Sequence, residues 1–160
     1  MKKIRGFTII ELIVVMAILA ALAAILVPLL FAYVSNARIS KLNTNARHVY
    51  GSVLYAATDY QAGNINIDLK PSSIYVGGAD CIGHSNNGDV CDLKNYFGDD
   101  FNGYFAFETD SSGVGCLYAL WSDRQIPISS VERLSEQDVK DSVSSSLPMG
   151  CYPHKVDDDT

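Results

Sequence analysis

The sequence predicts an α+β fold in which a long N-terminal helix, half of it transmembrane, packs on a small antiparallel β-sheet. Three observations lead to this prediction. An apolar run over residues 12–34 is long enough to cross a bilayer. Apolar residues at helical spacing then continue to about residue 61. In the C-terminal half, two apolar strands, 104–109 and 115–121, are separated by a short turn sequence.

One carboxylate, that of Glu11, stands at the start of the apolar run, behind a basic leader that contains Lys2, Lys3 and Arg5. A charge at bilayer depth costs about 2.5–3.5 kcal/mol even on permissive insertion scales, so such a residue is a functional candidate. Something must compensate the charge. The sequence offers one partner, the amine that would be exposed if the chain were cut after Gly6.

The order Gly6-Phe7-Thr8-Ile9-Ile10-Glu11 behind that leader resembles the N-terminal signature of type IV prepilins and the related pseudopilins. The resemblance covers about the first fifth of the chain in detail. It implies that a membrane peptidase cuts between Gly6 and Phe7 and that the new N-terminal Phe7 is N-methylated. It also implies that Glu11 is the glutamate needed for subunit assembly.

The same resemblance implies the partners and the location of the protein. Its partners would be other copies of itself and minor pilins in a filament, the prepilin peptidase, and the assembly platform in the cytoplasmic membrane. Before assembly the chain would cross that membrane once with its C-terminal part outside, and after assembly it would lie in an extracellular pilus.

Two other interpretations of the apolar run explain less. A secretory signal could be cleaved near Ala21-Leu22-Ala23, but the apolar run continues past that point to Val34, and Glu11 stands where an uncharged core is expected. A plain membrane anchor explains the length of the run. It explains neither Glu11 nor the Gly6–Phe7 junction.

We expect four segments: a leader peptide (1–6), an apolar transmembrane or filament-core helix (7–34), its amphipathic continuation (35–62), and an extracellular globular domain with disulfides (63–160). Pro28 is expected to kink the helix, and Gly63 to cap its C-terminus. The inner face of the amphipathic part comprises Ile39, Leu42, Ala46, Val49, Val53, Ala56 and Tyr60. Polar residues such as Arg38, Lys41, Asn45, Arg47 and Ser52 lie elsewhere on the helical wheel.

All four cysteines, Cys81, Cys91, Cys116 and Cys151, follow the apolar run. An even number of cysteines in a small exported domain predicts two disulfides, which places this part outside the cytoplasm. Three pairings are possible, and we favour Cys81–Cys91 with Cys116–Cys151. A zinc site at Cys81, His84 and Cys91 is the alternative, but it lacks a second ligand pair at metal spacing.

The rest of the chain predicts a small, loop-rich domain. Residues 63–103 are rich in Gly, Asn, Asp and Ser and are expected to form loops with at most short elements, such as a strand at 74–76. The turn 110–113 joins the two apolar strands into a hairpin that should lie against the long helix. A capping-box spacing from Ser129 to Glu132 predicts a helix over 130–143. An irregular tail with an acidic end follows.

No enzymatic constellation or cofactor motif is found. The histidines, His48, His84 and His154, are scattered, and no Ser or Cys lies in a nucleophile motif. Residues 100–103 resemble the start of a calcium loop but lack the downstream glutamate, so a solvated turn is the preferred interpretation. The net charge of −6 argues against bulk nucleic-acid binding.

The sequence therefore predicts a structural subunit of a type IV pilus. A pseudopilin of a secretion or DNA-uptake machine is the first alternative, and a membrane-anchored extracellular binding domain is the second. Adhesion, twitching motility and secretion are roles associated with this resemblance, and the residues do not choose among them.

Overall fold

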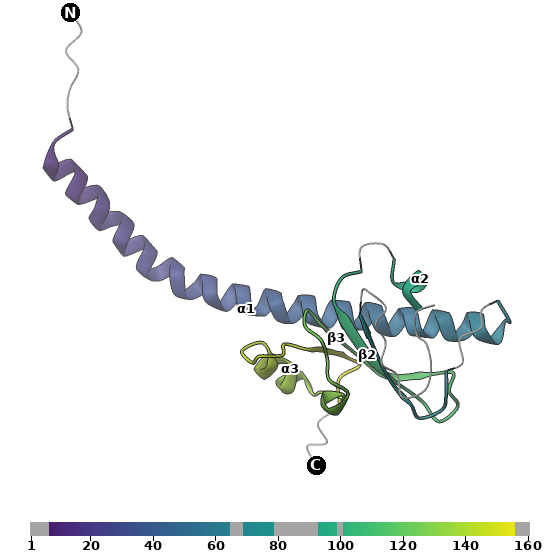
Figure 1. Ribbon diagram of the computed structural model, residues 1–160. Helices are drawn as coiled ribbons and strands as arrows, with labels where there is room; N and C mark the ends of the chain where they lie inside the picture. Colours follow the sequence, from purple (N-terminus) through teal and green to yellow (C-terminus); the bar gives the residue numbers. More distant parts are fainter. Residues whose placement is uncertain (1–6, 65–68, 79–92, 99–100, 156–160) are drawn as a thin grey trace, which may run out of the picture. The chain divides into compact units, whose positions relative to one another are not determined.

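The computed structural model describes residues 7–64, 69–78, 93–98 and 101–155. A single helix, α1 (Ile9–Gln61), runs through the N-terminal third, and its latter part lies beside a four-stranded sheet (Figure 1). The chain forms two compact units, divided between Ala37 and Arg38. The predicted fold class, a long N-terminal helix packed on a small antiparallel sheet, is thus confirmed.

The C-terminus of α1 is closed as the sequence predicts. Gly63 adopts a left-handed φ of 74°, which an L side chain disfavours. The amide of Gly63 donates to the Tyr60 carbonyl, and the amide of Asn64 donates to the Asp59 carbonyl, both at 3.0 Å. This pair of bonds is the Schellman arrangement, which satisfies carbonyls that the helix end leaves without partners. The helix contains Pro28 in its interior, and the kink expected there stays a prediction.

The sheet has the order β1-β2-β3-β4, with every neighbouring pair antiparallel. Its strands are β1 (Ile74–Gly78), β2 (Tyr104–Thr109), β3 (Cys116–Ser122) and β4 (Gly150–Tyr152). The predicted hairpin joins β2 to β3. Its turn is held by Asp110, whose carboxylate accepts from the amides of Ser112 and Gly115 at 3.0 and 3.1 Å, and Gly113 has φ 74°.

Two apolar layers cover the two faces of the sheet. The layer under α1 joins the inner helix face to the aromatic side chains of β2 and β3; its central members are Leu42, Ala46, Val49, Val53, Ala56, Phe105, Phe107, Ala119 and Trp121. The opposite layer includes Val76, Ala106, Leu120, Val131, Leu134, Val139 and Cys151. Each large apolar side chain that is fully buried contributes about 1.5–3 kcal/mol, so the layer under α1 fixes the helix on the sheet.

The inner face of α1 differs from the prediction at three positions, one of which is Ala57, a buried residue that was not expected there. Ser52 is buried, and its hydroxyl donates to the Tyr96 carbonyl at 2.9 Å. This bond satisfies the hydroxyl and ties the helix to α2 (Lys94–Phe97). Tyr60, expected on the inner face, is 38% exposed because it lies in the last turn before the cap.

The C-terminal elements also correct the sequence analysis. The predicted helix over 130–143 is replaced by a 3-10 turn, Ile128–Ser130, and a shorter helix, α3 (Glu136–Ser142). The capping box is formed by Ser135 and Asp138 rather than by Ser129 and Glu132. Both pairs have the required spacing, and packing of Leu134 and Val139 into the layer beyond the sheet favours the later start. The tail predicted to be irregular contributes β4.

Cys116 and Cys151 are both buried free thiols. Cys151 lies opposite Leu120, four residues along β3 from Cys116, which corresponds to roughly 10 Å or more, whereas a disulfide needs Cα atoms within about 7 Å. A β-bulge also turns Cys116 toward the α1 side of the sheet, while Cys151 packs on the other side. The described structure therefore does not contain the favoured Cys116–Cys151 disulfide. Cys81, Cys91 and His84 lie outside the described residues.

Candidate assembly site

The first turn of α1 is built around Thr8 and Glu11. The Glu11 carboxylate accepts from the Thr8 amide at 2.9 Å and from the Thr8 hydroxyl at 2.8 Å. The Glu11 amide in turn donates to the Thr8 hydroxyl at 3.4 Å. This is a capping box, in which a Thr and a Glu three residues apart satisfy amides that the helix start leaves free. The carboxylate is thereby oriented at the helix N-terminus, where the helix dipole favours negative charge.

Glu11 was predicted from the sequence as a functional candidate, whereas Thr8 was not. The signal was present, because Thr-x-x-Glu before an apolar run is the sequence form of a capping box. Of the residues that the resemblance implies, Phe7 is 82% exposed, and Gly6 lies outside the described residues. The structure places the Glu11 carboxylate on the amide of Thr8, two residues after Gly6.

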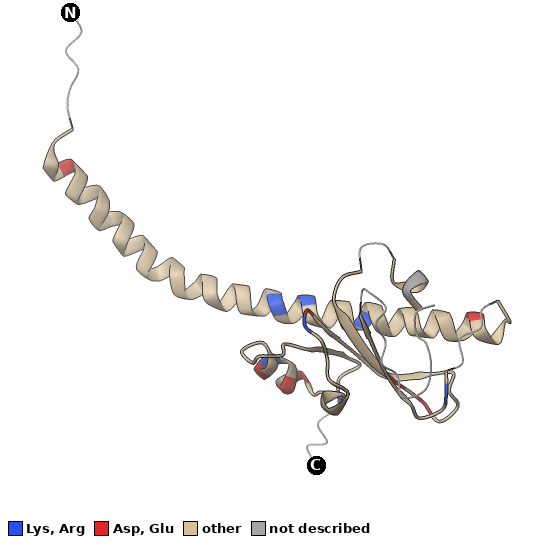
Figure 2. Cartoon of the chain, in the orientation of Figure 1, with Lys and Arg blue, Asp and Glu red and all other residues tan. Residues whose placement is uncertain are grey.

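Around this carboxylate the surface of α1 is apolar and uncovered. Glu11 is the only charged residue in 7–37. Figure 2 shows one red position near the start of α1, before the blue basic residues near the middle of the helix. Large side chains such as Ile10, Ile25 and Phe31 are 66–72% exposed within the chain. Among the described residues, α1 is the one helix long and apolar enough to cross a membrane, judged by length and composition.

An exposed apolar surface of this extent marks an interaction site. We therefore expect it to contact either lipid or another apolar protein surface. Residues 1–27 match the family model for the prokaryotic N-terminal methylation motif, the hallmark of type IV pilin and pseudopilin prepilin-like proteins. The chain carries a prepilin-type N-terminus. No curated protein and no solved structure matches the chain.

This prepilin-type N-terminus confirms the resemblance on which the sequence analysis relied. Proteins with the motif are structural, are processed by a prepilin peptidase and assemble into filaments. The long apolar helix fits membrane anchoring before assembly. The matched region ends before the globular unit begins at Arg38. The motif therefore characterises the N-terminal segment of the chain and gives no information about the β-sheet domain.

The other candidate sites of the sequence analysis are not assembled by the described residues. Those residues contain no group of three or more His, Cys, Asp or Glu side chains that could hold a metal ion. Asp100, the first residue of the calcium-loop resemblance, lies outside them. His48 stands on α1, and His154 lies near Asn43, with its Nε2 3.3 Å from the amide oxygen.

Proposed function

We propose that this protein is a structural subunit of a type IV pilus, cleaved after Gly6, N-methylated at Phe7 and assembled through the N-terminal helix. The observation that carries the proposal is a single oriented carboxylate, Glu11, on an otherwise apolar and uncovered helix. A filament buries such a helix among copies of itself, and a carboxylate there requires a positive partner. The amine of Phe7 after cleavage is that partner.

The amine of a neighbouring subunit fits this role better than the amine of the same chain. An amine on the same helix is present before and after docking, so it cannot favour assembly by itself. A neighbouring amine meets Glu11 only when the subunit docks. In an environment with little water the two charges attract far more strongly than at a wet surface. The cost of removing water from both groups must still be recovered, which requires close contact.

We further propose that the unit from Arg38 onward lies outside the cytoplasm. The cysteine content supports this orientation through the expected Cys81–Cys91 disulfide. The partners we propose are other copies of this chain, minor pilins, the prepilin peptidase and the assembly platform of the cytoplasmic membrane. The alternative of a pseudopilin shares the same N-terminal chemistry, and the matched motif is common to both classes.

Electron microscopy of surface filaments from cells with and without this chain tests the proposal. Loss of filaments on deletion, and return on expression of the chain as the sole pilin, is the expected result. Filaments that persist unchanged, together with loss of protein secretion or DNA uptake, would favour the pseudopilin. If the chain is never found in filaments and remains uncleaved in the membrane, it is an anchored binding domain.

A further inference from the structure

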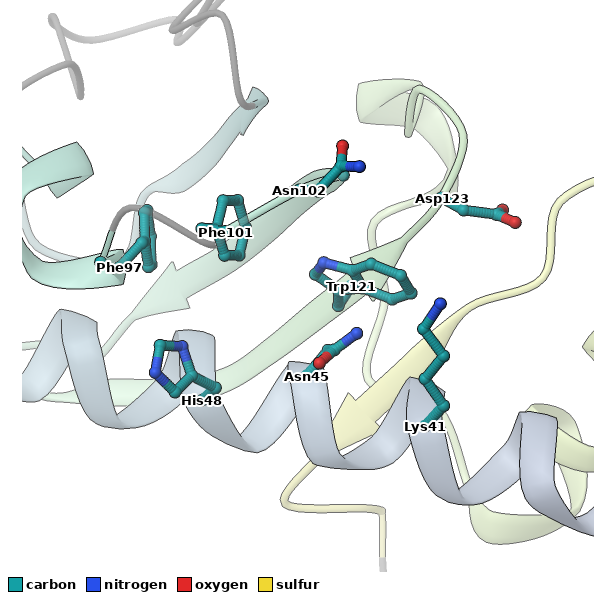
Figure 3. Close-up of a pocket in the computed structure, with 10 residues that line it drawn as sticks. Lys41, Asn45, His48, Phe97, Phe101, Asn102, Trp121 and Asp123 are labelled. Carbon is teal, nitrogen blue, oxygen red and sulfur yellow. The ribbon is translucent and has the colours of Figure 1, made fainter.

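The unit from Arg38 onward contains a pocket with a cavity volume of about 600 Å³. One wall is a face of α1 that carries Lys41, Asn45 and His48, at helical spacing. The opposite wall comes from the end of α2, the segment before β2, and β3 with the residue that follows it (Figure 3). These elements bring Phe97, Phe101, Asn102, Trp121 and Asp123 to the pocket. A cavity of this size holds a small molecule of one or two rings.

Aromatic rings line one side of the pocket. Phe97 and Phe101 stack with their ring centroids 4.5 Å apart. Trp121 is 4% exposed, with the ammonium of Lys41 5.7 Å from its ring centroid. Gly103 allows the indole to lie here, because a Cβ at that position would stand 2.7 Å from an indole carbon. These rings are therefore held in place by the fold, and Phe101 is the partly exposed member of the wall.

The indole N–H of Trp121 has no hydrogen-bond partner among the described residues. In that part of the chain, every side-chain nitrogen or oxygen that is fully buried does have a partner. The indole nitrogen is therefore not fully buried, and Figure 3 shows it on the side of Asn102 and Phe101, two residues that line the pocket. A tryptophan that is almost wholly buried normally finds a hydrogen-bond partner. A ligand that accepts this bond would complete the site.

The remaining polar groups define the chemistry of that ligand. Lys41 and Asp123 both line the pocket, and neither forms an ion pair with another described residue. Asn45 and Asn102 each add an amide that can donate and accept. A pocket with one charge of each sign, two amides and an available indole N–H suits a neutral ligand whose groups both donate and accept. Hydroxyl groups do both.

From these features we infer that the pocket binds a neutral saccharide ring. A pyranose has an apolar C–H face for the aromatic wall and a rim of hydroxyl groups for Lys41, Asn45 and Asp123. A phosphate would be repelled by Asp123 and would find one lysine. A purely apolar ligand would strip water from the charged groups without replacing their hydrogen bonds, which is costly. The inference concerns the globular unit and does not rest on the proposed filament assembly.

Trp121 is the only tryptophan of the chain, so its fluorescence reports the pocket directly. The full chain in detergent is titrated with glucose, galactose, N-acetylglucosamine and N-acetylgalactosamine. Sorbitol, which has hydroxyl groups but no ring, is the control ligand. We expect a saturable change with at least one sugar, with a dissociation constant on the order of 1 mM, and none with sorbitol. Because the assay needs no filament, its result is independent of assembly.

Two variants and a matched control localise the binding. Asn45→Ala should weaken binding about fivefold and Asp123→Asn about tenfold, as expected for a neutral and a charge-assisted hydrogen bond. Thr44→Ala removes an exposed neighbour of Asn45 that does not line the pocket, and it should leave binding unchanged. The absence of a saturable response to all four sugars at 20-fold above about 1 mM would overturn the inference. So would equal binding by all variants, or displacement of the sugar by inorganic phosphate.

Discussion

Glu11 and Thr8 hold each other at the start of α1, with the carboxylate bonded to both the amide and the hydroxyl of Thr8 at 2.9 and 2.8 Å. The carboxylate thus serves two purposes that a mutation can separate. It caps its own helix, and it carries the only charge in the apolar segment. If assembly depends on the charge, changes that keep the charge and weaken the cap should be tolerated.

The first prediction compares Glu11→Gln with Thr8→Val. Glu11→Gln removes the charge but keeps the shape, and it should strongly reduce the yield of sheared filaments while cleavage continues. Loss of one partner of a buried ion pair costs about 3–5 kcal/mol, which is large for a docking step repeated at every subunit. Thr8→Val keeps the charge and the amide bond, so filament yield should stay near that of the wild type.

Measurement of filament yield against mature subunit held in the membrane separates assembly from processing. Glu11→Ala should behave as Glu11→Gln does, because neither side chain supplies a charge. Normal filaments from Glu11→Ala as the sole pilin would exclude charge pairing as the docking mechanism. Equal loss in Thr8→Val would instead assign the defect to the helix cap.

The second prediction concerns processing. The mature chain should begin at Phe7 and carry one methyl group on its new amine, because the leader ends in the glycine at which prepilin cleavage is expected. Intact-mass measurement of purified filaments, or of the mature protein from membranes, checks this. A mass that still includes residues 1–6, or that corresponds to a chain starting near Ile25, would contradict the cleavage site.

The third prediction uses two glycines with opposite surroundings. A Cβ on Gly150 would overlap the backbone carbonyl group of Leu42, so Gly150→Ala must push β4 away from α1. We expect a loss of stability of about 1–3 kcal/mol or more. Gly51 lies inside α1, and beyond the adjacent helix backbone no atom lies within 4 Å of the place that a Cβ would take. Gly51→Ala should therefore stabilise the chain by about 0.5–1 kcal/mol.

Thermal unfolding of the full chain in detergent, with the two variants measured side by side, checks this pair. The informative result is a melting temperature that falls in Gly150→Ala and rises in Gly51→Ala. A general sensitivity to added methyl groups would lower both melting temperatures. A Gly150→Ala variant as stable as the wild type would show that β4 does not need its close approach to α1.

The fourth prediction follows from the separate positions of Cys116 and Cys151. In protein unfolded without reductant, both should react with an alkylating agent, whereas Cys81 and Cys91 should be found linked to each other. In the folded chain Cys116 should react slowly, because burial raises the pKa of its thiol to about 12, which leaves little thiolate. Peptide mapping distinguishes the cases, and a Cys116–Cys151 peptide would restore the pairing expected from the sequence.

The fifth prediction is a loss of stability in alkaline solution. The pKa of the Cys116 thiol is about 12 in the folded chain against an ordinary value of 9.0. Between these values the unfolded chain holds fewer protons, so the free energy of unfolding falls as the pH rises. The Cys116 contribution to that loss is about 1.4 kcal/mol at pH 10. Urea titrations at pH 7 and pH 10 check this, and Cys116→Ala should show a smaller fall than the wild type.

Features that depend only on residues close together in the chain could be predicted from the sequence. The length of the apolar run, the lone Glu11, the Gly63 cap and the turn at 110–113 each follow from the properties of a few neighbouring residues. Those predictions agree with the structure because no distant contact competes with them. Thr8 could have been found in the same way, since its partner is three residues away.

Features that depend on residues far apart in the chain emerged only once the chain was folded. Two serines had capping-box spacing, and burial of Val139 beyond the sheet selected Ser135 over Ser129. The β-bulge turned Cys116 to the face opposite Cys151. The Trp121 pocket joins α1 to residues from Phe97 to Asp123, far later in the chain. Local sequence patterns do not predict these contacts, because packing on both faces of the sheet decides which distant side chains meet.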